Sequence, residues 1–153
     1  MRKIKVKSKR RWEFIDITEQ VKKIIESENK NDDGFIHLWC PHTTAGLCVT
    51  VRQDEGNPLK EDIGDPDVVR DVKKGLQKLA PYEHGYKHFE MNSDAHIASI
   101  LTGPQLIIPY QAYYQAYSVP GPSYIKLQLG RWQAIYLAEF DGQRDREVWV
   151  NFL

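Results

Sequence analysis

Apolar and polar residues alternate at both ends of the chain, which predicts β-strands. Ile4 and Val6 alternate with lysines, and residues 12–17 alternate in the same way. This period of two is typical of strands with one buried face. Segments rich in β-branched and aromatic residues predict further strands at residues 34–40, 47–51, 124–129, 133–140 and 147–152.

Helical periodicity marks the middle of the chain. Thr18 is a suitable N-cap, and the apolar residues that follow it predict a helix over residues 18–28. Asp65 and Pro66 predict the start of a second helix, whose apolar positions share one face as far as residue 80. A short helix is predicted from Pro58, and another from residue 92 or 93 to Gly103.

The order of these elements predicts an α+β fold. The last strands follow one another through short connections, which favours antiparallel pairing, and 141–142 (Asp-Gly) is typical of a hairpin turn joining the last two. We therefore expect residues 1–153 to form a single compact domain, a largely antiparallel β-sheet or sandwich with two or three helices.

Composition narrows the class of protein. The 153 residues include 21 Lys plus Arg and 21 Asp plus Glu, so net charge gives no reason to expect binding to nucleic acid or to a membrane surface. The N-terminus has no apolar signal region and no apolar run is long enough to cross a bilayer, so we expect a cytoplasmic protein. Cys40 and Cys48 predict buried thiols in a reducing compartment rather than a disulfide framework.

Histidines are the strongest chemical signal. His42 lies in a polar gap between two predicted strands, beside the hydroxyls of Thr43 and Thr44. His84, His88 and His96 cluster in residues 82–103, and His96 falls on the first turn of a predicted helix, where anions are favoured. A three-histidine site with an open position commonly holds catalytic zinc. His37, within an apolar strand, is predicted to be structural.

Charged residues add a second set of candidates. Glu139 lies in an otherwise apolar strand, and a buried carboxylate requires a partner. Arg144 and Arg146 are candidates for that partner or for phosphate contacts. Arg131 and Gln133 lie at a strand start. An acidic run over residues 54–67 could bind magnesium, but we expect these residues to be solvated or to cap helices.

Four segments together resemble the YjbQ-like family, also described as the secondary thiamine-phosphate synthase family. They are residues 42–46 (His-Thr-Thr-Ala-Gly), 82–84 (Tyr-Glu-His), 94–99 (Asp-Ala-His-Ile-Ala-Ser) with Gly103 behind it, and 130–133 (Gly-Arg-Trp-Gln) running into 135–142. Their order and spacing extend over roughly residues 3–151. The chain departs from the pattern at 52–53, where Arg-Gln replaces a usual Asn-Glu pair, at Arg131, where Thr is usual, and in a longer segment over residues 110–129.

The resemblance implies a compact α+β homotrimer with sites near subunit interfaces. It implies that His42, His84 and His96 are the site histidines, gathered around a metal or an anion, and that Gln133 and Glu139 line or brace the site. It also implies thiamine phosphate synthesis, in which a hydroxymethylpyrimidine diphosphate is joined to a thiazole phosphate and pyrophosphate is released. The expected catalytic residues are His42, His84, His96 and Glu139. The same three histidines are the expected metal ligands. The expected substrate or phosphate contacts are Thr43, Thr44, Arg52, Arg131 and Gln133.

Three hypotheses follow. The first is an enzyme that acts on a phosphorylated small molecule, with magnesium accompanying a diphosphate substrate. The second is a hydrolase that uses a zinc-bound water at the three histidines. The third is a non-catalytic trimeric protein that binds a metabolite or a metal, favoured by the altered pair at residues 52–53.

Overall fold

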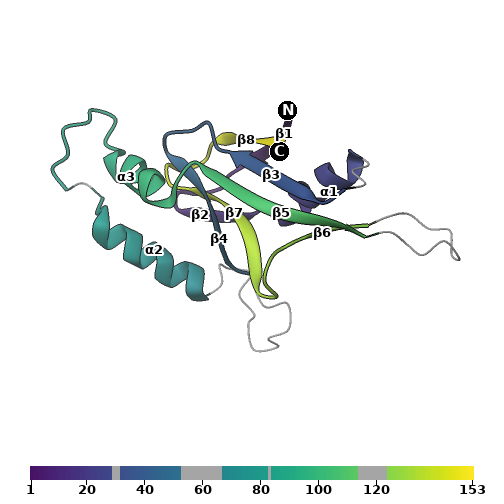
Figure 1. The fold of residues 1–153 in the computed structure, drawn as a ribbon. Helices are drawn as coiled ribbons and strands as arrows, with labels where there is room; N and C mark the ends of the chain where they lie inside the picture. The colour runs from purple at the N-terminus through teal and green to yellow at the C-terminus, as the bar shows by residue number, and fades with distance from the viewer. Residues whose placement is uncertain (29–31, 53–66, 83, 114–123) are drawn as a thin grey trace, which may run out of the picture.

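The computed structural model describes residues 1–28, 32–52, 67–82, 84–113 and 124–153. In these residues the chain forms strands and helices with the following bounds: β1 (Arg2–Lys7), β2 (Glu13–Asp16), α1 (Thr18–Ser27), β3 (Gly34–Trp39), β4 (Ala45–Val51), α2 (Asp67–Leu79), α3 (Ser93–Thr102), β5 (Gln105–Tyr113), β6 (Tyr124–Leu127), β7 (Gln133–Glu139) and β8 (Asp145–Phe152). A five-stranded sheet has the order β1-β8-β3-β5-β6, and a three-stranded sheet has the order β2-β7-β4 (Figure 1). Every pairing is antiparallel, which confirms the predicted α+β class.

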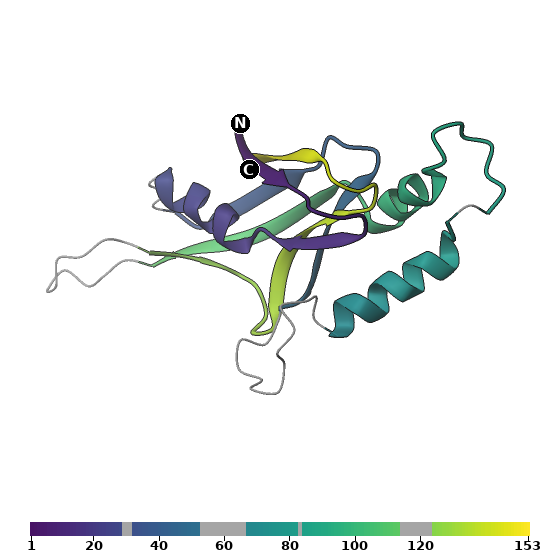
Figure 2. The ribbon, with the colours of Figure 1, turned by 180° about the vertical axis from the view of Figure 1, so that it is seen from behind.

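The two sheets pack against each other across the main hydrophobic core. Helix α1 adds Val21 and Ile25 to this core, and it continues from β2 on the side of the five-stranded sheet that faces the viewer in Figure 2. Helices α2 and α3 cover the other face of the three-stranded sheet, where Val69, Ala95 and Ala98 belong to a second core. The three-stranded sheet is therefore buried on both faces.

Strand β7 lies at the centre of this arrangement. Ile135 and Leu137 face the main core, while Tyr136 and Ala138 face the second core. Since both faces are buried, β7 has a continuous apolar run rather than the alternation of a strand with one wet face.

The predicted hairpin at residues 141–142 is wrong. Strand β7 pairs with β2 on one edge and with β4 on the other, so it has no free edge for β8. The chain instead turns at Gly142, whose φ is +100°, and crosses into the five-stranded sheet. There β8 pairs with β1 and β3. The connection is short, but it joins two sheets.

The helix ends are set mostly by local chemistry. Thr18 begins α1 instead of preceding it, and the Asp16 carboxylate accepts hydrogen bonds from the Thr18 N–H and hydroxyl. Gly103 ends α3 as predicted, with a φ of +94° that favours glycine. The helix predicted from Pro58 and the start of the one predicted from Asp65 lie outside the described residues. No helix in the described part of the chain is long and apolar enough to cross a membrane.

Candidate functional site

One end of the three-stranded sheet collects polar residues from segments far apart in the sequence. The Phe140 N–H donates to the Thr44 carbonyl at 3.1 Å, and the Ser99 hydroxyl donates to the Ala45 carbonyl at 2.7 Å. These bonds join the loop before β4 to the turn after β7 and to α3. Arg11 lies in the segment before β2, and its guanidinium lies 4.6 Å from the ring centroid of Tyr82, which belongs to the second motif. Parts of all four sequence motifs therefore meet at this end, which we call the polar end.

Glu139 is the buried centre of the polar end. Arg146 donates from Nε to Glu139 Oε2 and from Nη2 to Oε1, both at 2.6 Å, and from Nη2 to the Thr44 hydroxyl at 2.8 Å. Glu139 also accepts from the Ser8 hydroxyl and from the Asp141 N–H. A buried carboxylate requires such partners, so the prediction that Glu139 pairs with an arginine is confirmed, and Arg146 is that arginine. Glu139 is fully buried, a placement that favours bracing over contact with a substrate.

His42 lies in hydrogen-bond contact with the backbone of Glu147. The N–H of Glu147 donates to His42 Nε2 at 2.8 Å. Burial and the nearby Arg146 charge lower the pKa of His42 below its ordinary value. A neutral imidazole whose Nε2 accepts a hydrogen bond carries its proton on Nδ1. His42 is therefore a neutral donor through Nδ1.

The hollow beside His42 is lined by side chains of both charges. It has a volume of about 580 Å³, and Lys5, Lys7 and Arg146 line it together with Asp145 and Glu147. Glu147 is already paired with Lys3 at 2.8 Å, and this contact, with a second one to the Trp149 indole, lowers the pKa of Glu147. Of the two hydroxyls predicted beside His42, Thr44 is buried against Arg146 and Thr43 is exposed.

The start of α3 contributes a second set of buried polar residues, which sequence reasoning missed. Arg11 donates to Asp94 Oδ1 at 2.7 Å, and Asn92 donates to Asp141 Oδ2 at 3.1 Å. Arg144 also donates to Asp141, at 2.7 Å. Asp94 lies within a matched motif but was not separated from its neighbours by residue type alone. The available sequence signal was an Asp on the first turn of an otherwise apolar predicted helix.

The structure does not bring the three predicted site histidines together in one chain. His96 lies against His88, with ring centroids 5.4 Å apart, whereas His84 lies against Tyr86. His42 lines a different hollow from His96. Across the described residues, no group of three or more His, Cys, Asp or Glu side chains is placed to hold a metal ion. His37 contacts Gln105 on the outer face of β3, away from these hollows.

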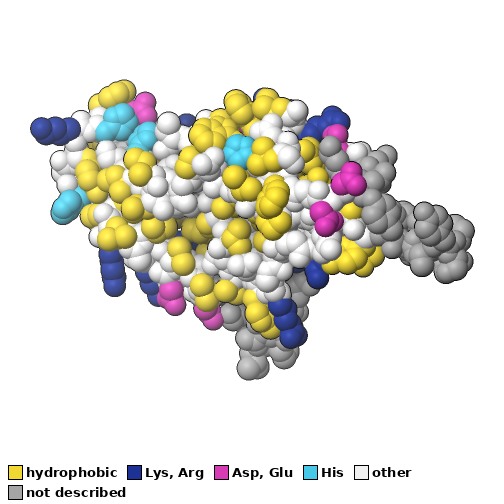
Figure 3. All heavy atoms as spheres, viewed as in Figure 1, with side chains coloured by type: hydrophobic (Ala, Val, Ile, Leu, Met, Phe, Trp, Pro, Cys, Tyr) yellow, Lys and Arg dark blue, Asp and Glu magenta, His cyan; other side chains and the backbone are white. Residues whose placement is uncertain are grey.

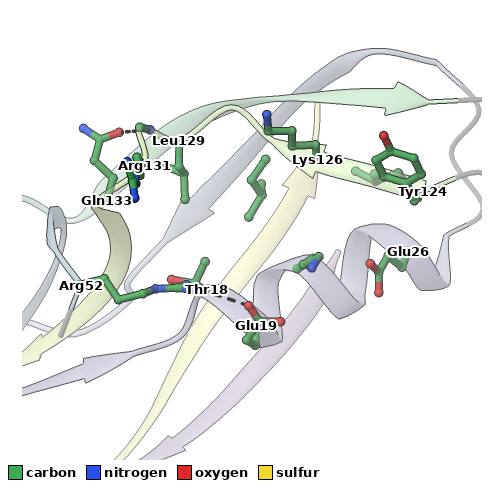
Figure 4. A pocket seen from close by; sticks show the side chains of 13 residues that line it. Thr18, Glu19, Glu26, Arg52, Tyr124, Lys126, Leu129, Arg131 and Gln133 are labelled. Atoms are coloured by element: carbon green, nitrogen blue, oxygen red, sulfur yellow. Dashed lines mark hydrogen bonds and ion pairs between the residues drawn. The ribbon is translucent and has the colours of Figure 1, made fainter. Parts of the chain in front are cut away.

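The opposite end of the three-stranded sheet forms a cleft lined by basic residues, which we call the basic cleft (Figure 4). Its volume is about 430 Å³, and it contains three predicted phosphate contacts, Arg52, Arg131 and Gln133. Lys22 and Lys126 add two further cations, and Glu19 and Glu26 add two carboxylates.

The contacts of Arg52 in the basic cleft are long. Arg52 Nε lies 3.6 Å from Asp16 Oδ2 and Nη2 lies 3.9 Å from Glu19 Oε1. Arg52 Nε is buried and has no hydrogen-bond partner among the described residues. The Arg52 side chain is 39% exposed and that of Arg146 is 8% exposed, so Arg52 is the more accessible of the two to a ligand from solvent.

The register of β4 and β7 separates the polar end from the basic cleft. Ala45 pairs with Glu139 at one end, and Val51 pairs with Gln133 at the other. At about 3.3 Å per residue, the six steps from Ala45 to Val51 correspond to roughly 20 Å. A single small substrate cannot contact both ends within one chain.

The cysteines do not supply a reactive thiolate. Both are free, and Cys40 is buried as predicted, whereas Cys48 is half-buried. Burial raises the pKa of Cys40 to about 11 and that of Cys48 to about 12. Both thiols therefore stay protonated at neutral pH.

The two antiparallel sheets and their helices place this chain in the class of small α+β proteins, with His42 near the end of a strand. The YjbQ-like family model, described as UPF0047 protein YjbQ-like, matches residues 2–153. The chain belongs to this family.

Relatives and solved structures agree with this assignment. A UPF0047 protein of Archaeoglobus fulgidus is 34% identical over 150 residues, with 97% of each chain covered. UPF0047 protein MJ1081 of Methanocaldococcus jannaschii is 37% identical over 152 residues, covering 99% of this chain and 92% of the relative. A crystal structure of a YjbQ/UPF0047 protein from Clostridium acetobutylicum, described as uncharacterized, superposes with a TM-score of 0.78 at 37% identity and complete coverage of both chains.

Proposed function

We propose that this protein is an enzyme of phosphorylated small molecules, which joins a hydroxymethylpyrimidine diphosphate to a thiazole phosphate and releases pyrophosphate. The observation that carries the proposal is the state of His42. Its Nε2 accepts the Glu147 N–H, so its Nδ1 carries the proton, and His42 lines the same hollow as Lys5 and Lys7. A hydrogen-bond donor in a hollow with cations suits an anionic group, and Glu147, one of the two carboxylates of this hollow, is already paired with Lys3.

In the proposed reaction, a bond forms between the methylene carbon of the pyrimidine and the thiazole nitrogen. The bond between that carbon and the diphosphate oxygen breaks, and its electron pair leaves with the pyrophosphate. Hydrogen bonds aimed at a leaving oxygen stabilise the charge that develops there. His42 Nδ1–H would supply such a bond, while Glu139 and Arg146 would hold the neighbouring loop in place.

The same observation disfavours the zinc hydrolase. A zinc ion requires the lone pair of a ring nitrogen. In neutral His42 that lone pair belongs to Nε2, which already accepts the Glu147 N–H. We therefore derive no step through a zinc ion at His42.

Two substitutions of His42 test the proposal. Asn retains a donor near the position of Nδ1, whereas Gln retains an acceptor near Nε2 for the Glu147 N–H. In an assay with both precursors and magnesium, we expect His42→Gln to lower kcat by about 10²-fold, the effect of removing one such donor, and His42→Asn to retain more activity. Equal rates in the wild type and both variants would contradict the proposal. Pyrophosphate binding without turnover would favour the non-catalytic alternative.

We also propose that the protein assembles as a homotrimer, which the apolar stripe of α2 supports. Val69 on this stripe is buried, but Val68, Val72 and Leu79 are 44%, 37% and 68% exposed. One edge of the stripe thus packs on its own chain and the other edge is uncovered. Apolar side chains are also exposed across the face that carries β3, β5, α2 and α3 (Figure 3). A large exposed apolar surface is typical of an association site.

Assembly would also bring the basic cleft of one chain close to the His42 of another. The basic cleft keeps Arg52, Arg131 and Gln133 as proposed phosphate contacts, but it lies roughly 20 Å from His42 along β4. Ends contributed by two copies could meet around one substrate.

Light scattering on size-exclusion fractions tests the assembly. We expect three chains per particle in the wild type and smaller particles for Val72→Lys. The matched control is Gln77→Lys, which places the same charge on the exposed opposite face of α2. A wild-type monomer, or dissociation by the control alone, would contradict the proposal.

A further inference from the structure

Two histidines that lie eight positions apart in the sequence lie side by side in the fold. The ring centroids of His88 and His96 are 5.4 Å apart and their planes are 82° from parallel. His96 is on the first turn of α3, where its N–H donates to the Asn92 carbonyl. His88 begins a tight turn that the Met91 N–H closes onto the His88 carbonyl at 3.1 Å. Both residues line one hollow, which has a volume of about 440 Å³.

The spacing of these rings fits a shared metal ion. An ion bound to a ring nitrogen at about 2.0–2.1 Å lies roughly 3.2 Å from the ring centroid, so two imidazoles at a tetrahedral angle have centroids roughly 5.2 Å apart. The observed separation is close to this value. The His88 side chain is 38% exposed, so an ion from solvent can reach the pair.

A carboxylate next to the pair offers a third ligand. Glu90 Oε2 lies 3.8 Å from His88 Nε2. Two donors on one tetrahedral ion are about 3.4 Å apart, so a small rotation of the Glu90 side chain would complete the set. No three such side chains in the described ranges already stand in a metal-holding arrangement. The fold therefore brings two imidazoles close together, and in the proposed site they, Glu90 and water would be the ligands. Lys87 also lines the hollow and opposes the ion's charge.

We propose that His88 and His96, assisted by Glu90, bind a divalent transition metal ion of the zinc class in a single chain. Imidazole with one carboxylate suits zinc and its neighbours rather than calcium or magnesium. The bound ion would tie the segment before α3 to the first turn of that helix. This site is separate from His42, and it does not depend on the proposed function.

His84 provides a matched control. It lies in the same segment and was expected to ligate a metal, but its ring lies 6.1 Å from that of Tyr86. Substituting His84 therefore removes one nearby imidazole without touching the pair.

The test is a zinc titration of chelator-treated full-length protein, followed by calorimetry and by NMR of the histidine ring C–H groups. We expect one zinc per chain, with shifts at His88 and His96. His88→Ala and His96→Ala should each abolish this saturable binding, Glu90→Gln should weaken it by about tenfold, and His84→Ala should leave it unchanged.

Four results would overturn the inference. They are no zinc binding by the wild type, binding that survives both His88→Ala and His96→Ala, loss of binding in His84→Ala, and half a zinc per chain accompanied by a new oligomer. The last result would place the ion between two copies. None of these readouts uses enzymatic activity, so the proposed function stands or fails separately.

Discussion

The two ends of strands β4 and β7 differ sharply in how their charges are held. At the polar end, Glu139 and Arg146 are 0% and 8% exposed, and both carboxylate oxygens accept hydrogen bonds. At the basic cleft, the Arg52 side chain is 39% exposed, and among the described residues the carboxylates of Asp16 and Glu19 lie 3.6 Å and 3.9 Å from it. The same two strands thus support a rigid network at one end and accessible cations at the other. The first arrangement can position a reacting group, and the second can bind a ligand from solvent.

The largest difference between the ends should appear on removing one buried charge. Glu139→Ala leaves the Arg146 guanidinium buried without its carboxylate, and we expect a loss of about 3–5 kcal/mol in the free energy of unfolding. Urea denaturation measures this loss. The matched substitution at the basic cleft, Glu19→Ala, removes an exposed carboxylate and should change stability by less than about 1 kcal/mol.

A double substitution sharpens this result. Replacing Glu139 and Arg146 together by apolar residues should cost less than Glu139→Ala alone, because no uncompensated charge remains. Equal losses at Glu139 and Glu19 would contradict the distinction between the ends.

A smaller effect is expected on ligand binding at the basic cleft. Arg52→Gln removes a guanidinium whose contacts with Asp16 and Glu19 are long, so we expect the affinity for pyrophosphate to fall by about tenfold, the loss of one charged hydrogen bond. Stability should change little. Calorimetric titration measures the affinity, and Arg70→Gln, an exposed arginine on α2, is the control. An affinity that falls equally in both variants would show general charge attraction rather than a site.

The smallest effect concerns pH at the polar end. The pKa of His42 is lowered in the folded protein, mainly by burial. Below the ordinary value of 6.5, the unfolded chain binds a proton at His42 more readily than the folded chain does, so stability falls as the pH drops through this range. Above 6.5 both states are neutral and the contribution is constant.

Urea denaturation at several pH values on either side of 6.5 tests this prediction. The stability difference between the wild type and His42→Asn should shrink or reverse as the pH falls. A difference that does not change with pH would show that His42 does not titrate differently on folding.

Local patterns located the helices and most strands because each depends on neighbouring residues. Alternation at Ile4 and Val6, helical spacing after Thr18 and the stop at Gly103 all correspond to observed elements. The turn near Gly142 failed as a hairpin prediction. Its sequence is compatible with a tight turn, but local sequence does not indicate that β2 and β4 pair with both edges of β7.

The candidate site shows the same limit. A carboxylate in an apolar strand was enough to predict an arginine partner for Glu139, since an unpaired buried charge is too costly. Which histidines meet was a different matter. His88, four residues from His84, is the one that contacts His96. The choice depends on a turn at residues 88–91 that residue type alone did not reveal.

The sequence by itself determined the family, the α+β class and the set of residues able to carry chemistry, because periodicity, burial cost and motif order are properties of the chain. Only the tertiary structure decided how those residues are grouped. Antiparallel pairing of β4 with β7 placed Glu139 at one end and Gln133 at the other, roughly 20 Å apart. Proximity between distant segments is fixed by how sheets and helices pack, and no local pattern encodes that packing.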